Sequence, residues 1–274
     1  MEKKILEKLQ QVETDILNVI VKICEDNNID YFLVGGTLLG AIRHKGFIPW
    51  DDDLDIAMPR KDYDRFVDIC LKKLPKEYFI HCKYTDDNYW LPFIKIRKKG
   101  TVFEERPMVN IETHKGIFVD VFPLDNANKQ KSSLQFFQAY LSKKISGLIM
   151  HKRGLDIGQL KLINSLVLKI TKSISIRRLS DIRDKIMTLN KNEKSEYYIN
   201  IGSNYNFTKQ TIPKNKYFPL TLVEFEGNNY KAPKDWDYVL KRIYGDYMKL
   251  PPEDKRVTHN PVRLKFEGED EIIF

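Results

Sequence analysis

Four aspartates within five consecutive positions constrain the fold of this chain more than any other feature. They are Asp51, Asp52, Asp53 and Asp55, and apolar residues alternate with polar or small ones from position 53 onward. In an extended strand alternate side chains share a face, so the pattern predicts that Asp51, Asp53 and Asp55 stack on one side. Stacked carboxylates repel unless a divalent cation neutralises them, and hard oxygen ligands suit Mg²⁺ or Mn²⁺. The sequence therefore predicts a metal site; the alternative is a solvated acidic turn.

Two glycines precede this acidic segment. An apolar run over 31–34 meets Gly35 and Gly36, and a stretch with helical character follows from Thr37 to Arg43. Glycine amides at a helix N-terminus bind phosphate groups well. We therefore expect Gly35, Gly36 and Thr37 to hold a substrate phosphate in the same cleft as the metal.

A further carboxylate, Asp120, stands alone in the apolar run GIFVDVFPLD over 116–125. A charge buried in such a strand needs a partner or a metal. Asp120 is therefore predicted to join the acidic site, either as a metal ligand or as the base that accepts a hydroxyl proton. The alternative is an aspartate on a strand face that water reaches.

Several basic and aromatic residues lie near these segments. Arg43 and His44 precede the acidic loop and are candidates for phosphate or hydroxyl contacts, although a lone histidine is more often structural. Lys95 and Arg97 alternate on one predicted strand face, which suits a phosphate or pyrophosphate. Trp50 is a candidate to cover the metal site or to stack on a nucleotide base; the alternative is an aromatic residue of the core without a role in binding.

Composition limits the class of protein. The chain has 274 residues, is 42% hydrophobic and carries a net charge of +8. It can bury a large core, contains no apolar stretch long enough for a spanning helix and shows no cleavable signal. Three widely spaced cysteines argue against a disulfide framework and a structural zinc site, and they fit a reducing cytoplasm. Residues 129–185 hold thirteen Lys or Arg against three acids, a local balance of +10, so any basic partner surface lies there.

Periodicity predicts an α+β chain whose mixed-sheet core has flanking helices and a large helical insertion. Predicted helices cover 3–27, 37–43, 60–73 and 235–244; predicted extended runs cover 31–34, 53–57, 78–83, 90–97, 101–105 and 116–125; and residues 129–190 are mainly helical with breaks near Gly154 and Gly158. We expect a catalytic core over 1–128, a basic helical insertion over 129–200 and a C-terminal segment over 201–274 that completes the substrate site.

Motifs in order along the chain resemble those of the LicD family of phosphotransferases, which includes the fukutin-related proteins. The matching segments are GGTLLGAIRHKGFIPWDDDLDIAMPRKDYDRF (35–66), FIKIRKKGT (93–101), GIFVDVFPLD (116–125), FEG (225–227) and YGDYMKLPPEDKR (244–256). The Gly-Gly turn, the D-x-D and the later Asp are also the pattern of the nucleotidyltransferase superfamily, whose fold resembles polymerase β. The family motif places metal ligands on Asp51, Asp53, Asp55 and Asp120. It also makes Lys255, Arg256 and His259 candidates for nucleotide or acceptor binding; the alternative for each is ordinary surface charge.

The resemblance implies transfer of a phospho-alcohol, most often phosphocholine from CDP-choline, to a hydroxyl of a cell-surface glycan, with release of CMP. The acceptor would be a lipid-linked precursor of teichoic acid, capsule or lipopolysaccharide at the inner face of the cell membrane. One alternative is a nucleotidyltransferase that moves NMP from an NTP to a protein, an RNA or a small molecule. The other is a nucleic-acid or membrane-binding protein. No recognisable nucleic-acid module is present, and we expect no nucleic-acid partner.

The basic segment over 129–185 interleaves lysines with Phe136, Phe137 and Tyr140. Anionic headgroups attract lysines near a membrane surface, and aromatic side chains insert shallowly. We therefore expect peripheral attachment through this segment, with an inward-packing helical lid over the acceptor cleft as the alternative.

Overall fold

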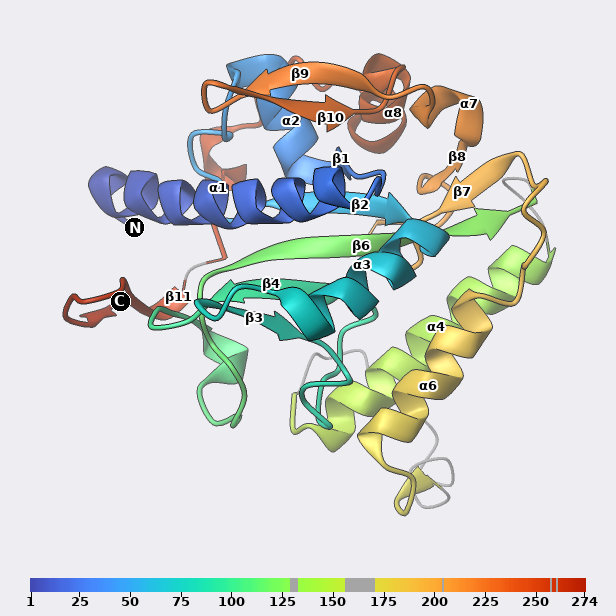
Figure 1. The fold of residues 1–274 in the computed structure, drawn as a ribbon, viewed down its shortest axis with the longest axis horizontal. Helices are drawn as coiled ribbons and strands as arrows, with labels where there is room; N and C mark the ends of the chain where they lie inside the picture. Colours follow the sequence, from blue (N-terminus) through green and yellow to red (C-terminus); the bar gives the residue numbers. More distant parts are fainter. Residues whose placement is uncertain (129–132, 156–170, 204, 257, 260) are drawn as a thin grey trace.

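The computed structural model describes residues 1–128, 133–155, 171–203, 205–256, 258–259 and 261–274. It confirms an α+β chain built on a mixed sheet, with the N-terminal helix lying along one face (Figure 1). Across the sheet the strands run β1 (Phe32–Leu33), β2 (Asp55–Pro59), β6 (Phe118–Ala127), β4 (Ile94–Lys98) and β3 (Tyr78–His81). β2 and β6 are parallel, whereas β1 with β2, β6 with β4 and β4 with β3 are antiparallel.

Smaller strand groups extend this sheet or pack beside it. The end of β6 also pairs with β7 (Tyr197–Ile199), which pairs with β8 (Thr211–Pro213). β5 (Val102–Glu105), β11 (Pro261–Lys265) and β12 (Ile272–Ile273) form a three-stranded sheet, and β9 (Thr221–Phe225) and β10 (Asn228–Ala232) form a hairpin. The C-terminal strands therefore pack back onto the first half of the chain.

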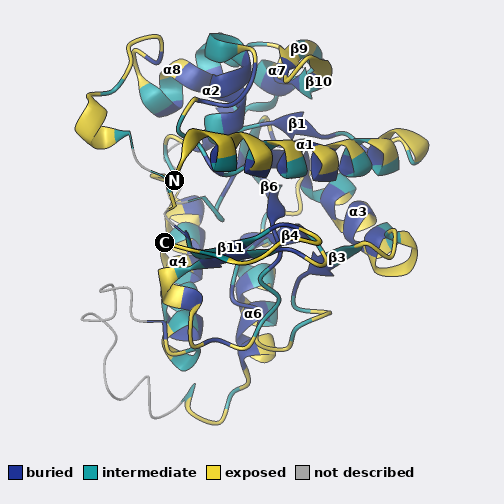
Figure 2. Ribbon diagram, turned by 90° about the vertical axis from the view of Figure 1, so that its left-hand side faces the viewer, coloured by how far each residue is buried: buried dark blue, intermediate teal, exposed yellow. Residues whose placement is uncertain are grey.

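Helices cover the sheet, and the residues buried between the helices and the sheet are apolar. Helices α1 (Lys3–Asp26) and α3 (Arg60–Lys73) lie on the same face of the sheet (Figure 1). α1 buries Leu9, Ile16, Leu17 and Ile20 completely, and its exposed residues follow the side that faces away from the sheet (Figure 2). This one-sided burial is the expected result of its 3.6-residue periodicity.

The remaining helices are distributed around the sheet. They are α2 (Gly35–His44), α4 (Ser133–Lys152), α6 (Ile176–Met187), α7 (Lys214–Tyr217), α8 (Trp236–Tyr244) and the 3₁₀ turns η1 (Arg106–Met108) and η3 (Glu253–Lys255). α4 and α6 pack against each other at one end of the sheet (Figure 1). A second apolar cluster, which includes Trp90, Ile149 and Leu179, fixes this pair to the loop after β3.

Where the predicted elements fall on described residues, they agree with the structure except at their ends and at one important point; residues 129–132 and 156–170 of the predicted helical segment lie outside the described residues. α4 ends at Lys152, and Gly154 has a left-handed φ of +78°, as expected for a helix break there; the break predicted at Gly158 lies outside the described residues. The acidic segment, however, does not enter its strand at position 53. β2 begins at Asp55, so the prediction of three acids stacked on one strand is wrong.

The FEG motif (225–227) has a structural role. Phe225 is fully buried and its ring lies 4.9 Å from that of Phe47. The Glu226 carboxylate accepts a hydrogen bond from the Phe47 amide at 3.0 Å, and Gly227 closes the hairpin with a φ of +74°. The hairpin therefore supports the connection that leads from α2 into the acidic segment.

Candidate functional site

Two parallel strands bring the first pair of predicted carboxylates together. Asp55 on β2 stands directly opposite Asp120 on β6, and the Asp120 amide donates to the Leu54 carbonyl at 2.9 Å. Residues opposite each other in a sheet share a face, so both side chains point to the same side. The pairing brings together acids that are 65 positions apart in the chain.

The N-terminus of α2 lies against the same carboxylates. A Cβ atom on Gly35 would stand 2.8 Å from Asp55 Oδ2, and one on Gly36 would stand 2.6 Å from Asp51 Oδ2. Both distances are too short for a real Cβ, so only glycine permits this approach. The Thr37 hydroxyl accepts a hydrogen bond from the Asp55 amide at 2.8 Å. The predicted closeness of the glycines, the helix N-terminus and the acids is confirmed, and Thr37 supports Asp55 from within the protein.

Asp51 and Asp53 reach the site from a loop. The Asp51 amide donates to the Ile48 carbonyl at 2.8 Å, which forms a turn, and Gln10 of α1 donates to the Asp51 carbonyl at 2.8 Å. These bonds keep the backbone before Leu54 out of the sheet ladder. The loop nevertheless leaves Asp51 close enough to Asp53 and Asp55 for their charges to interact.

This concentration of negative charge raises the pKa values of several carboxyl groups. Burial, reinforced by the neighbouring Asp53 carboxylate, raises the pKa of Asp51 to about 8. Burial and the charges of Asp53 and Asp120 likewise raise the pKa of Asp55. Burial also raises the pKa of Asp120, although Lys95 opposes this effect. Without a cation the cluster is therefore electrostatically unfavourable.

Lys95 and Arg97, predicted as a matched pair, have different partners. The Lys95 ammonium donates to Asp120 Oδ1 at 2.6 Å and lies 3.3 Å from the centre of the Phe118 ring. Arg97 donates instead to His81 Nδ1 at 2.9 Å and to the Gly116 carbonyl at 2.6 Å. Both side chains are buried, so Lys95 belongs to the acidic site and Arg97 forms an internal network beside it.

Asp52 was not predicted as a site residue, but the structure gives it a clear function. Its side chain is fully buried, and both of its oxygens accept hydrogen bonds from the His259 amide, at 2.9 and 3.0 Å. The His259 ring also donates from Nδ1 to Asp52 at 2.9 Å, and its Nε2 lies 3.7 Å from Asp53. The hydrogen bond with Asp52 raises the pKa of His259 to about 10, so the imidazole is a cation beside the acids.

The C-terminal segment 244–259 is tied to the site at two further points. Arg43 donates to the Tyr247 carbonyl at 2.7 Å and to His44 Nε2 at 2.9 Å. Because it accepts that bond, His44 is neutral, and burial together with the Arg43 charge lowers its pKa. The Arg256 guanidinium lies over the Trp50 ring at 5.0 Å.

The segment 244–259 borders the acidic cluster. Contacts of Arg256 with Trp50 and of His259 with Asp52 join this segment to the acidic loop, and Arg43 joins it to α2. Lys255, in η3, is exposed. These contacts confirm that the residues lie together; their roles toward a substrate remain predictions.

The residues fit a divalent metal chemically. Asp51, Asp53, Asp55 and Asp120 offer only hard oxygen donors, and a small divalent cation would relieve the part of their repulsion that Lys95 and His259 leave in place. Within the described parts of the chain, no three Asp, Glu, His or Cys side chains lie in a geometry that could hold a metal ion. Carboxylates hold one another apart when no cation lies between them.

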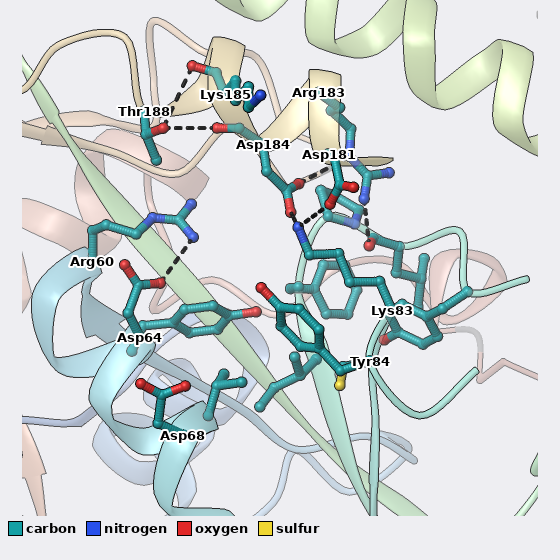
Figure 3. A pocket seen from close by; sticks show the side chains of 18 residues that line it. Arg60, Asp64, Asp68, Lys83, Tyr84, Asp181, Arg183, Asp184, Lys185 and Thr188 are labelled. Atoms are coloured by element: carbon teal, nitrogen blue, oxygen red, sulfur yellow. Dashed lines mark hydrogen bonds and ion pairs between the residues drawn. The ribbon is translucent and has the colours of Figure 1, made fainter. Parts of the chain in front are cut away.

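A cavity of about 500 Å³ lies elsewhere, between α3 and α6 (Figure 3). Several of its charged side chains are already paired: Lys83 binds Asp181 and Asp184 at 2.8 and 2.7 Å, and Arg60 binds Asp125 at 2.7 Å. None of the described residues that line it is a predicted site residue. The cavity is therefore separate from the acidic cluster.

Comparison with known proteins supports the same region as the functional one. Residues 28–150 match the family model described as LicD/FKTN/FKRP, nucleotidyltransferase domain. This match includes all four predicted acids and Lys95 but not the segment 244–259.

Individual relatives extend the comparison. The chain is 30% identical over 271 residues to the lipopolysaccharide cholinephosphotransferase LicD of Haemophilus influenzae, covering 95% of this chain and 97% of that protein. It is 44% identical over 43 residues to the ribitol 5-phosphate transferase FKRP of Homo sapiens, covering 16% of this chain and 9% of that protein. An uncharacterized protein of Rickettsia prowazekii is 28% identical over 145 residues, which is 44% of this chain.

Proposed function

The chain belongs to the LicD family, and from this membership we propose that it is a transferase that moves phosphocholine to a hydroxyl of lipopolysaccharide or a related cell-surface glycan. The observation that carries the proposal is the cluster of Asp51, Asp53, Asp55 and Asp120 at the N-terminus of α2. The similarity to the Haemophilus influenzae transferase, which covers 95% of the chain, includes this cluster. Few arrangements other than phosphate chemistry require four acids beside a glycine-bordered helix end.

We further propose that the donor is a CDP-alcohol, with CDP-choline as the first candidate, and that CMP is the leaving group. A nucleotidyltransferase-like fold, similar to that of polymerase β, is part of the proposal. The parallel strands β2 and β6 with acids opposite each other, and a glycine-initiated helix beside them, support it. Teichoic acid and capsule precursors remain alternative acceptors to lipopolysaccharide.

Each group in the site has a proposed task. Asp53, Asp55 and Asp120, with Asp51 beside them, would hold Mg²⁺ or Mn²⁺, which supplies positive charge for the phosphate oxygens of the donor. Asp120 also has the position of a base, because its hydrogen bond from Lys95 keeps one carboxylate oxygen fixed. The amides at Gly35 and Gly36 provide hydrogen-bond donors for the donor phosphate.

The border formed by Arg43, Arg256 and His259 has a complementary task. A donor pyrophosphate bound at the acidic cluster would lie beside this border, and these cations would bind its oxygens. Trp50, held under Arg256, is positioned to stack on the cytosine base. Asp52 fixes His259 and so determines where this border lies.

We place the reaction at the inner face of the cell membrane, where lipid-linked glycan precursors are assembled. No helix within the described residues is long and apolar enough to cross a bilayer. Attachment would therefore be peripheral, through the basic residues of 129–185.

The leaving group tests the proposal. The protein is incubated with Mg²⁺, an acceptor and a panel of CDP-choline, CDP-glycerol and CDP-ribitol, and in parallel with the four NTPs. Metal-dependent release of CMP from a CDP-alcohol, with the alcohol phosphate appearing on the glycan, is the expected result. Release of pyrophosphate from an NTP instead would identify a nucleotidyltransferase.

A further inference from the structure

Five aromatic residues form a strip on the surface that leads toward the acidic cluster. They come from α4, from the segment between β7 and β8, and from the end of α8: Phe136, Tyr140, Phe207, Tyr205 and Tyr244. Large exposed aromatic groups are uncommon on a protein surface unless they bind something. Phe136, Tyr140 and Tyr205 are 60%, 54% and 44% exposed, and this exposure is typical of a surface that binds a partner.

Ring contacts connect the strip from one element to the next. The Phe136 ring is nearly parallel to that of Tyr140, with centres 6.4 Å apart, and meets the Phe207 ring edge-on at 5.8 Å. Tyr205 and Tyr244 make an edge-on contact at 5.6 Å, and their hydroxyls are hydrogen-bonded at 3.1 Å. Positions 205 and 207 lie two residues apart, so the two pairs of contacts form one path.

The inner end of this path lies at the acidic site. Gly202, three residues before Tyr205, lies beside Phe93, whose ring is 4.2 Å from that of Phe122, two positions after Asp120 on the same face of β6. Three residues after Tyr244, the Tyr247 carbonyl accepts a hydrogen bond at 2.7 Å from Arg43 of α2, the helix that begins beside the acids. The carboxylates of Asp55 and Asp51 contribute to the raised pKa values of Tyr205 and Tyr244, after the larger effect of burial. These contacts place the segment that carries Tyr205 on the side of β6 from which Asp120 projects.

We propose that this aromatic strip is the binding surface for the acceptor glycan and leads a sugar chain from α4 to the acidic cluster. The proposal rests on the proposed transferase function and adds to it the location of the acceptor. A sugar ring presents a face of C–H groups that packs on an aromatic ring, while its hydroxyls bond to polar groups at the edge of that ring. Tyr140, Tyr205 and Tyr244 offer both kinds of contact.

A glycan fits the strip better than a membrane does. A helix that lies in a bilayer surface needs a broad apolar face. α4 exposes Leu134, Phe136, Phe137 and Tyr140, but they are mixed with lysines, and the ring contacts continue beyond this helix to Phe207 and, through Tyr205, to Tyr244. Lys144 lies over the Tyr140 ring at 5.4 Å, which adds a cation suited to an anionic substituent on the glycan.

Binding without the donor tests the proposal separately from catalysis. The probes are the core oligosaccharide freed from lipopolysaccharide by mild acid, water-soluble teichoic acid, and vesicles of anionic phospholipid without glycan. The variant is Phe136→Ala/Tyr140→Ala, whose exposed positions should leave the fold intact, and this is checked by thermal unfolding. The control is Phe274→Ala, which removes an exposed aromatic, 48% accessible, at the C-terminal end of the molecule (Figure 1).

We expect the double variant to bind the soluble glycan at least about tenfold more weakly, since two rings are lost. In transfer assays its KM for the acceptor should rise while CMP release to water without acceptor is unchanged. Normal glycan binding by the double variant would overturn the proposal, as would failure of the wild-type protein to bind either glycan. Loss of vesicle binding alone would also overturn it and identify a membrane surface. If glycan binding depends on the strip but no CDP-alcohol is cleaved, the strip stands and the proposed donor chemistry fails.

Discussion

At the scale of single residues, the acidic cluster is held together against its own repulsion. Asp51 and Asp55 have raised pKa values because burial and neighbouring carboxylates disfavour their charged forms. A folded protein tolerates such an arrangement mainly where it has a function. The residue-scale predictions therefore separate charge, geometry and stability.

Asp55→Asn, and equally Asp53→Asn, should reduce transfer more than about 100-fold, because each removes a negative charge that would bind the metal yet changes the volume little. The metal-free variant should unfold at a higher temperature than wild type, since one buried like charge is gone. Activity and thermal unfolding without metal are measured for both, with Asp68→Asn on the exposed side of α3 as the control. Wild-type turnover in Asp55→Asn at saturating Mg²⁺ would disprove its assignment.

Asp120→Asn should be at least as damaging as loss of Asp51, because Asp120 comes from a separate strand and fixes the geometry of the cluster. Its role follows from two measurements, Mg²⁺ affinity and kcat. Weaker metal binding identifies a ligand, whereas unchanged affinity with a fall in kcat of at least about 100-fold identifies a base. An active variant with normal affinity would remove Asp120 from the site.

The buried His81 should make the free energy of unfolding depend on pH. Its Nδ1 accepts a bond from Arg97 and its Nε2 lies 3.0 Å from Asp86, and burial lowers the pKa of the ring to about 4. In the unfolded chain a histidine binds a proton near pH 6.5, so between those values the unfolded state takes up more protons than the folded one. Stability should therefore fall by about 3 kcal/mol as pH drops from 6.5 to 4.

Denaturant unfolding at several pH values measures this effect. His81→Asn should be less stable at pH 7 and should show a shallower fall toward pH 4, whereas substitution of the exposed His151 should change neither. Equal acid slopes in wild type and His81→Asn would show that another group governs the acid sensitivity.

At the scale of elements, the closest approach in the site is between the start of α2 and the acidic loop. Gly36 does not need a left-handed backbone, so alanine is compatible with the helix itself. Its Cβ, however, would stand 2.6 Å from Asp51 Oδ2. The effect of a substitution should therefore fall on the carboxylate and not on the fold.

Gly36→Ala should lower metal affinity and activity by about 10- to 100-fold, because the added methyl group would displace the Asp51 carboxylate. Thermal stability should change little. A double-mutant cycle with Asp51→Ala tests the cause. If Gly36→Ala acts by displacing Asp51, it should have no further effect once that carboxylate is gone. Additive losses would mean that the glycine matters for another reason, such as access of a phosphate to the helix amides.

At the scale of the whole molecule, the positive charge and the reaction site lie in different parts of the chain. The predicted membrane contact rests on residues 129–185, which hold the excess of basic residues. Two of those cations are already used internally: Lys152 donates to the carbonyls of Thr171 and Lys172, and Arg153 donates to that of Glu112. Lys143 and Lys144 on α4 are the better candidates for a bilayer.

Wild-type protein should co-sediment with anionic vesicles, and binding should weaken with salt. Lys143→Glu/Lys144→Glu should weaken it by at least about 30-fold, since each lysine near the surface contributes about 1 kcal/mol. Charge reversal at Lys152 and Arg153 should instead lower thermal stability, because it breaks internal bonds. Absence of wild-type binding at low salt would rule out the tether and leave the inward-packing lid.

The sequence alone predicted α1, α2, α3 and α8 and most strands of the first half of the chain, and it singled out the four carboxylates, because each depends on local periodicity or on neighbouring residue types. It did not predict the short strands β7 to β12. It also contained a signal for Asp52 that was missed: in an alternating segment this residue faces away from Asp51 and Asp53, and a buried aspartate needs a partner. That partner, His259, lies 207 positions away and could not be found from spacing.

Only the tertiary structure decided how similar residues divide their roles. Lys95 and Arg97 look equivalent in the sequence, yet one binds Asp120 and the other His81, because neighbouring strands place different acceptors beside them. The start of β2 at Asp55 depends likewise on bonds from Gln10 and His259 to the acidic loop. The aromatic strip joins three distant segments. Contacts between remote parts of a chain depend on how elements pack, and packing energies are not encoded in any local pattern.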